Sequence, residues 1–451
     1  MAETFDELNK RTQRREIIAR QRMLQRKRRR ILQIVAACSI AAVCLLIVGV
    51  LVFRGVDPGP SSADTQPSTT APTQPTTLPP TTAPTQPPTT APTQPPTTVP
   101  VPTEPETVIQ LAFGGDLNIT DASVAAGEQG GRYDYTDIFM DAAGIFAAAD
   151  AAFVNLEGIV TGAPYGTQSA SAPPEMLKAL ADAGVDMVQL ANSYAVYGGL
   201  GGLSNTMNAV RAAGMEPLGV FANNQEYSQS QGFTLVNIRG IRVAVVAFTK
   251  GMDGMSLPAG AEHCVNLLYT DYNTTYQTVN TDGITAVLRA AQAQKPDVTI
   301  ALVHWGSEYN DSISPTQETI AKLMLAEGVD AIVGTHSHRV QKIAYDASAG
   351  TVVAYSLGDL FGNAEKDGTN YSILLQLEIT RNNITGETKI TGCDYTGLYV
   401  LTPQRDGEPM RIVQIETAMA LYEHDHIFKV SDKAYNNMKY AFQRIQARVE
   451  G

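Results

Sequence analysis

The stretch DAIVGTHSHRV, residues 330–340, runs from a short apolar segment directly into two histidines one residue apart. A short apolar run bounded by turn residues is typical of a buried β-strand, which places His336 and His338 at a strand end. The whole chain has only six histidines. In an extended backbone, residues two apart point to the same side, so both imidazoles are expected to face one cavity. The stretch therefore predicts a pair of metal ligands.

Similar apolar runs recur upstream and alternate with amphipathic segments. Buried strands are predicted at 108–113, 151–155, 185–191, 242–248, 298–303 and 330–334, and helices at 174–184, 203–214, 283–294 and 316–328. This alternation predicts an α/β fold with a mainly parallel sheet. After residue 350 the pattern is rich in strands, which predicts a second, antiparallel sheet packed on the first. Residues 430–449 are predicted to form a final exposed helix.

Three further metal-competent side chains follow predicted strands: Asp116, Glu157 and His304. Sites in open α/β sheets form beyond the carboxyl ends of the strands. Taken singly, each such residue is more often a turn residue, a helix cap or a hydrogen-bonded structural side chain. The convergence of two carboxylates and three imidazoles at strand ends favours one shared site. The other histidines, His263, His424 and His426, follow no predicted strand, and EHDH at 423–426 is interpreted as a surface turn.

The predicted ligand set contains oxygen and nitrogen donors and no thiolate. Such a set suits Mn, Fe, Zn or Mg rather than a structural zinc site rich in cysteine. Two metal ions about 3.5–4 Å apart can share a bridging carboxylate and activate a water molecule between them. Phosphoester hydrolysis is the usual chemistry of that arrangement.

The first hundred residues have a different composition. Residues 1–30 carry 11 Lys and Arg against 4 Asp and Glu, and residues 31–53 are an uncharged apolar run. That run is long enough to cross a bilayer, and basic flanks stay cytoplasmic, so a single-pass membrane protein is predicted with its C-terminal domain extracellular. A cleaved signal peptide is the alternative. Residues 54–106 are rich in Pro and Thr and are predicted to be a disordered extracellular linker.

Charge and cysteine content limit the possible partners. Residues 55–451 carry a net charge of −20, which argues against nucleic acid and against an anionic lipid surface. Cys264 and Cys393 can form a disulfide outside the cell or remain two free thiols. No CxxC or zinc-finger spacing occurs in the chain.

The motifs FGGDLN, FVNLEG, LANSYAVYGG, VHWGSEY, GTHSHRVQ and YSLGDLFG occur in the order typical of the CapA family, which the chain resembles over about residues 107–365. That family is similar to calcineurin-like metallophosphoesterases and is associated with synthesis or export of poly-γ-glutamate capsule. The resemblance implies a four-layer α-β-β-α sandwich, assigned here to residues 107–410, with a C-terminal extension over 411–451. It also implies that Asp116, His304, His336 and His338 are ligands, that Glu157 bridges two metals, and that Glu308 orients a ligand or faces substrate.

One motif departs from the family pattern. The family has Leu-Ala-Asn-Asn-His and, after two intervening residues, Asp, whereas this chain reads LANSYAVY at 190–197. Ser193 therefore stands where a ligating Asn is expected, Tyr194 where the catalytic His is expected, and Tyr197 where the Asp is expected. Asp359 stands where Asn is usual. Loss of a positioned acid–base group typically costs about 10²–10⁴ in rate.

Three functions fit this sequence. The first is a membrane-anchored CapA-like protein that acts in capsule or poly-γ-glutamate synthesis or export, with an anionic envelope polymer as partner and a divergent metal site. The second is an active extracellular metallophosphoesterase on a phosphorylated envelope or nutrient substrate. The third is a non-catalytic binding module that retains one metal or none.

Overall fold

The computed structural model describes residues 105–424 and 428–450. Within those ranges, no helix combines the length and apolar character needed to cross a bilayer. This finding overturns the predicted single-pass membrane localisation, which we do not retain. The predicted tail 1–30, the predicted span 31–53 and all but the last two residues of the predicted linker lie outside the described residues.

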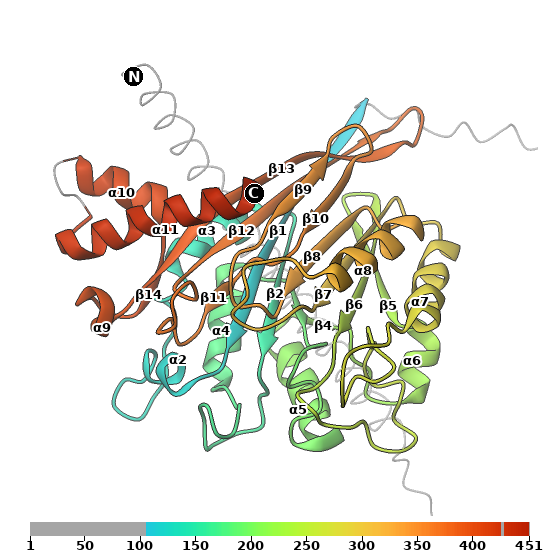
Figure 1. The fold of residues 1–451 in the computed structure, drawn as a ribbon, viewed down its shortest axis with the longest axis horizontal. Coiled ribbons are helices and arrows are strands. Elements are labelled where there is room, and N and C mark those ends of the chain that lie inside the picture. Colours follow the sequence, from blue (N-terminus) through green and yellow to red (C-terminus); the bar gives the residue numbers. More distant parts are fainter. Residues whose placement is uncertain (1–104, 425–427, 451) are drawn as a thin grey trace, which may run out of the picture. The chain divides into compact units, whose positions relative to one another are not determined.

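Two mixed β-sheets form the centre of the described chain (Figure 1). Sheet 1 has the order β14-β13-β12-β1-β2-β3-β4, with β11 also paired to β1, and sheet 2 has the order β5-β6-β7-β8-β10-β9. The strands of sheet 1 are β1 (Glu106–Asn118), β2 (Ala151–Glu157), β3 (Met187–Gln189), β4 (Glu216–Leu218), β11 (Asp359–Phe361), β12 (Tyr371–Asn382), β13 (Thr388–Leu401) and β14 (Arg411–Gln414). Those of sheet 2 are β5 (Phe233–Ile238), β6 (Ile241–Thr249), β7 (Val298–His304), β8 (Ala331–Thr335), β9 (Ile343–Asp346) and β10 (Thr351–Ala354).

The predicted division into one parallel and one antiparallel sheet is wrong. Strands β1 to β4 run parallel in sheet 1, and β6, β7, β8 and β10 run parallel in sheet 2. The late strand β12 then pairs antiparallel with β1. Strands buried on both faces have the same continuous apolar pattern in either sheet, so the local pattern does not assign them to one.

Alternate residues of the sheet-2 strands face two different cores. On β6, Val243 and Val245 belong to the core that includes the strands of sheet 1. Ala244 and Val246, on the opposite face, pack in the core formed with α7 and α8. The described part thus has two sheets packed together with helices outside them, in agreement with the implied layered α/β sandwich. The helices are α2 (Asp121–Ala125), α3 (Met140–Ala148), α4 (Pro174–Ala183), α5 (Gly199–Ala212), α6 (Asn224–Ser230), α7 (Thr281–Ala293), α8 (Pro315–Ala326), α9 (Pro403–Asp406), α10 (Ile415–Glu423) and α11 (Asp432–Glu450).

Helix α11 packs on sheet 1 through one regular stripe. It contacts β12, β13 and α10 (Figure 1). Its buried residues recur every three or four positions, as on one face of an α-helix: Ala434, Met438, Ala441, Ile445 and Val449. The helix is therefore held by an apolar face, and its other faces carry polar side chains.

A close backbone approach joins β1 to β11 beside the candidate site. The Asp116 amide donates a hydrogen bond of 3.1 Å to the Gly358 carbonyl oxygen. A Cβ atom at Gly115 would lie 1.8 Å from that same oxygen, so only glycine fits there. The glycines of FGGD and SLGD thus bring Asp116 and Asp359 into register as neighbours on parallel strands.

Candidate metal centre

The structure gathers all five predicted ligands in one buried cluster. Asp116 and Glu157 come from β1 and β2 of sheet 1, whereas His304 ends β7 and the other two histidines follow β8 of sheet 2. Each of the five residues is at most 4% exposed. The cluster thus lies where the carboxyl ends of parallel strands from both sheets meet.

Asp116 links the two sheets through its carboxylate. Its Oδ2 accepts a 2.9 Å hydrogen bond from the His336 amide, and its Oδ1 accepts one of 2.6 Å from the Asn155 side chain. Oδ1 also lies 3.8 Å from His304 Nδ1. These contacts hold the Asp116 carboxylate in one orientation, with both oxygens toward the cluster.

Glu157 and His304 form the centre of the cluster. Glu157 Oε1 lies 3.2 Å from His304 Nε2, and Glu157 Oε2 lies 3.7 Å from His338 Nδ1. The same His304 Nε2 lies 3.0 Å from His336 Nδ1. On the other side of the ring, His304 Nδ1 lies 3.0 Å from Thr335 Oγ1, which orients the imidazole.

The two histidines after β8 reach the site by a different backbone from the predicted one. His336 and His338 have φ values of 88° and 56°, so the chain is left-handed at both positions rather than extended. The prediction that an extended backbone points both side chains to the same side is therefore wrong. Non-glycine residues in this region are strained and cluster at functional sites. The turn still directs both rings inward, with their centroids 6.3 Å apart.

Two groups of donor atoms are close enough to hold cations. Each group consists of three side chains whose donor atoms lie within 4.8 Å of one another. The first group is Glu157, His304 and His336, and the second is Asp116, Glu157 and His338. Glu157 is common to both groups. Two buried atoms of the cluster, Glu157 Oε2 and His336 Nε2, have no hydrogen-bond partner.

Burial dominates the electrostatics of the cluster. It raises the pKa of Asp116 to about 7, with the charge of Glu157 adding to the effect, and it raises the pKa of Glu157 to about 7. It lowers the pKa of His304 to about 3 and that of His336 well below its usual range. Two imidazoles are therefore neutral, which is the form that binds a metal.

His338 behaves differently because it pairs with Asp359. Burial alone would lower the pKa of His338, but the carboxylates of Asp359 and Glu157 outweigh it and raise that pKa well above the usual range. Nδ1 of His338 lies 2.7 Å from Asp359 Oδ1. The aspartate at 359 thus gives this histidine a charged partner.

Sequence reasoning missed several polar side chains that support the cluster. Besides its bond to Asp116, Asn155 accepts a 3.0 Å hydrogen bond from Asn192. Asn192 in turn donates to the Leu156 carbonyl oxygen at 2.6 Å. The only signal for Asn155 is its place inside the otherwise apolar run at 151–156.

The segment LANSYAVY, residues 190–197, contacts the same cluster. Ser193 Oγ is 3.1 Å from His304 Nε2, so the Ser193 hydroxyl is within hydrogen-bond distance of a candidate ligand. Burial, with the nearby charge of Glu157, raises the pKa of Tyr194 to about 12, so its phenol is protonated at neutral pH. Tyr197 donates to the Gln168 carbonyl oxygen, on the exposed side of the motif.

Charged side chains of both signs lie near the cluster. Glu308 is exposed and belongs to neither donor group, although its charge contributes to the raised pKa of Glu157. Lys250, which follows β6, donates to the Gly306 carbonyl oxygen at 2.9 Å and lies over the Tyr276 ring. Burial lowers the pKa of Lys250.

Cys264 and Cys393 are both free thiols, so the disulfide alternative is not realised in this structure. Cys264 is buried, and Cys393 lies on β13.

The chain belongs to the bacterial capsule synthesis protein family PGA_cap, whose model matches residues 110–364. It is 29% identical over 215 residues to the capsule biosynthesis protein CapA of Bacillus anthracis, a match that covers 47% of this chain and 48% of that protein. It is 25% identical over 310 residues to the PGA biosynthesis protein CapA of Bacillus subtilis, covering 65% of this chain and 73% of that protein. The chain thus spans about half the length of the first relative.

Solved structures show weaker similarity. A phosphatase from Mycoplasma pneumoniae matches with a TM-score of 0.40 and 12% identity, covering 66% of this chain and 96% of that one. A putative 5′-nucleotidase from Staphylococcus aureus matches with a TM-score of 0.41 and 12% identity, covering 76% and 58%.

Proposed function

We propose that this protein acts in the synthesis or export of an anionic capsule polymer of the poly-γ-glutamate type, and that its buried cluster holds divalent metal ions. Family membership supports the polymer role, since the B. subtilis relative is named for PGA biosynthesis. The observation that carries the metal assignment is the pair of donor groups that share Glu157. A shared carboxylate is the usual bridge of a two-metal site.

The residues present fit such ions. Two buried carboxylates without a full set of hydrogen bonds are costly in a protein interior, and a divalent cation offsets that cost. Glu157 Oε2 and His336 Nε2 are buried atoms with a free lone pair or proton, as expected of ligands. Asp116, His304 and His338 complete the donor set, which suits Mn, Fe or Zn. When bound, the ions supply Lewis acidity and lower the pKa of a coordinated water.

The side chains around the cluster support a slow or altered reaction rather than a fast one. Tyr194 is protonated at neutral pH and can donate a hydrogen bond, but it cannot accept a proton as a general base. Ser193 offers a neutral hydroxyl where the family has an amide oxygen. Absence of a positioned acid–base group costs about 10²–10⁴ in rate. Weak phosphoester hydrolysis is therefore the second candidate function, favoured by the otherwise intact donor set.

The test combines metal analysis with an activity screen on the full chain. We expect about two metal equivalents after manganese or zinc supplementation, and fewer in His336→Ala. The double variant Ser193→Asn with Tyr194→His should raise hydrolysis of bis(p-nitrophenyl) phosphate by ~10²-fold or more if the site is merely impaired. No bound metal in the supplemented wild type would refute the metal assignment. Full metal content with no gain in the double variant would favour the third function, a binding module.

A further inference from the structure

Three arginines converge on one carboxylate beside the metal centre. Arg448 Nη2 lies 2.5 Å from Asp311 Oδ2, Arg444 Nη2 lies 3.8 Å from it, and Arg339 Nη1 lies 3.9 Å from it. Arg339 directly follows the candidate ligand His338 in sequence. We call these three residues the arginine cluster. Asp311 is the only carboxylate among the described residues that forms an ion pair with the cluster, so the three arginines and Asp311 together carry a net charge of +2.

The cluster has more hydrogen-bond donors than the protein satisfies. The Arg448 side chain is only 8% exposed, and its Nε and Nη1 atoms have no partner. The Nε atoms of Arg339 and Arg444 are also buried without a partner. Buried guanidinium groups are costly unless they are paired. Arg444 is 42% exposed and Arg339 21% exposed, so both can still contact an anion from solvent.

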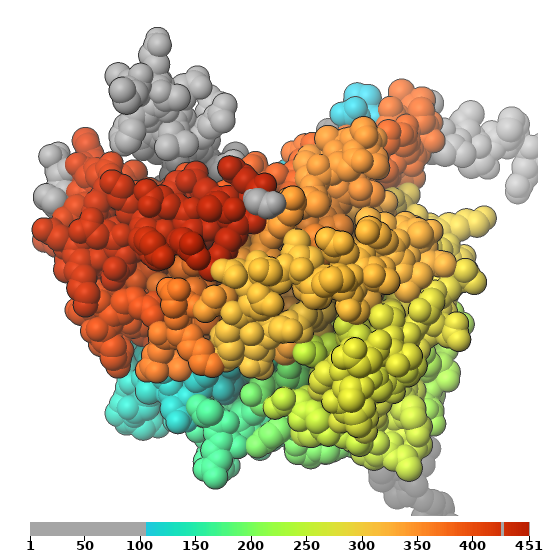
Figure 2. Space-filling view, viewed as in Figure 1, coloured from blue at the N-terminus to red at the C-terminus, as the bar shows by residue number. Residues whose placement is uncertain are grey.

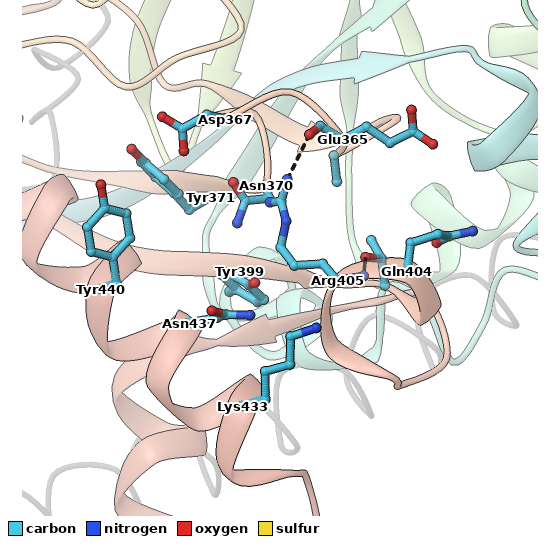
Figure 3. A pocket seen from close by; sticks show the side chains of 12 residues that line it. Glu365, Asp367, Asn370, Tyr371, Tyr399, Gln404, Arg405, Lys433, Asn437 and Tyr440 are labelled. Carbon is cyan, nitrogen blue, oxygen red and sulfur yellow. Dashed lines mark hydrogen bonds between the residues drawn. The ribbon is translucent and has the colours of Figure 1, made fainter.

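A cavity of about 530 Å³ adjoins the arginine cluster. The Tyr371 ring joins the two features, because it lines the cavity and also lies 5.4 Å from the Arg448 guanidinium carbon. Figure 3 shows Lys433, Asn437 and Tyr440 projecting toward the cavity from one side, with Arg405 and Asn370 opposite them.

Helix α11 lines both features with a single face. Its cavity residues and its two arginines are three or four positions apart, so they share one side of the helix: Lys433, Asn437, Tyr440, Arg444 and Arg448. From 433 to 448 this face is roughly 22 Å long. In the space-filling view, the red C-terminal helix lies directly against gold and orange segments of the chain (Figure 2). The face is suited to an extended ligand rather than a single small ion.

The cavity also contains an unsatisfied acceptor. Asn370 is 6% exposed, and its Oδ1 has no hydrogen-bond partner. Its amide group hydrogen-bonds the Tyr399 hydroxyl, which itself donates to Asp406, so the Asn370 oxygen is the free atom. A buried acceptor needs an N–H or O–H donor. A polyamide offers N–H groups along its backbone, whereas polyphosphate and polyacrylate offer none.

We propose that the α11 face, from the cavity to the arginine cluster, binds an extended acidic polyamide, with carboxylates on Arg339 and Arg444 and a backbone N–H on Asn370. This inference names the contact surface for the polymer and rests on the proposed function for that polymer's class. The metal centre takes no part in it.

Fluorescence anisotropy of the full chain with a labelled γ-glutamate decamer tests the proposal. Binding should weaken with rising salt, because charge pairing at the surface is screened. Arg444→Ala should weaken binding by about tenfold or more, and Arg339→Ala should do the same. Lys439→Ala is the matched control, since Lys439 is exposed on the opposite side of α11 and its loss removes the same charge. That control should change affinity less than about twofold.

Two polyanions without N–H groups test whether the site prefers a polyamide over other polyanions. Polyacrylate and inorganic polyphosphate of matched charge should bind more weakly than the decamer. Equal or tighter binding of polyphosphate would refute the polyamide assignment, and unchanged affinity in both arginine variants would refute the site. Binding is measured in a chelator and in His336→Ala, where it should persist. Failure here therefore leaves the metal assignment standing, and loss of metal binding leaves this inference standing.

Discussion

Replacing Glu157 with glutamine should stabilise the metal-free protein although Glu157 belongs to the proposed metal centre. Its side chain is 2% exposed, and Oε2 accepts no hydrogen bond. Burial, partly offset by His338, raises its pKa from 4.5 to about 7. One pKa unit is worth about 1.4 kcal/mol. Keeping this carboxylate ionised therefore costs the fold roughly 3.5 kcal/mol at most, and coupling to neighbouring carboxylates reduces the expected gain to about 1–3 kcal/mol.

The sign of this effect follows from the raised pKa. The folded state disfavours the ionised acid, so the cost is absent below the unfolded-state pKa and complete above the folded-state pKa. The advantage of Glu157→Gln should grow as the pH rises from about 4.5 to about 7 and persist at pH 8.

Metal reverses the order of stability. At a free concentration 1,000 times Kd, a metal ion that binds only the folded state stabilises it by about 4.1 kcal/mol, which exceeds the advantage of the variant. The variant lacks the shared carboxylate of both donor groups and should gain little from the ion. It should thus be more stable than wild type in chelator and less stable in manganese.

Urea unfolding of the full chain gives the free energy of unfolding at pH 5 and pH 8, each in chelator and in manganese. Glu175→Gln, an exposed residue in the first turn of α4, is the control and should stay within about 0.5 kcal/mol of wild type. A variant that is less stable than wild type in chelator at pH 8, or that gains as much from manganese, would refute the reasoning.

Two further substitutions test the supports of the site. Asn155→Ala removes the 2.6 Å hydrogen bond to Asp116 and should weaken metal binding about 10–100-fold in a chelator competition titration. Secondary structure, measured by circular dichroism, should stay unchanged. Unaltered metal affinity would show that Asp116 does not need this hydrogen bond. Trp305→Phe removes the 2.8 Å hydrogen bond from the buried indole to the Tyr355 carbonyl oxygen and should lower the free energy of unfolding in urea by about 1–3 kcal/mol. A decrease below about 0.5 kcal/mol would show that this hydrogen bond contributes little to stability.

The elements and the five clustered residues could be predicted because their signals are local. A polar residue after an apolar run marks a strand end, and the carboxyl ends of parallel strands share an edge. That reasoning brought Asp116, Glu157 and His304 together correctly, although it assumed one parallel sheet. In the structure the carboxylates come from one sheet and the imidazoles from the other. Strand pairing is a non-local property, and apolar periodicity alone does not encode it.

Other features of the site had no local signal. The left-handed backbone at His336 and His338 is set by the junction between the sheets, since the His336 amide bonds the Asp116 carboxylate. Helix 430–449 was predicted as exposed, yet α11 buries a regular apolar stripe against the sheet. The hydrophobic residues of that stripe are visible in the sequence, but the surface that receives them is not. Arg444 and Arg448 were therefore overlooked as partners of Asp311.

The arrangement of the loops connects the metal centre to the arginine cluster. The Tyr309 ring stacks on His338 with centroids 5.2 Å apart, and Asp311, which anchors the arginines, is two residues further along the same loop. The family model ends at residue 364, whereas α11 begins at 432. The candidate metal centre is thus built from residues within the matched family region, and most of the α11 face is built from residues beyond it. Substitutions on α11 should therefore alter polymer binding while leaving metal content unchanged, because no candidate ligand lies on that helix.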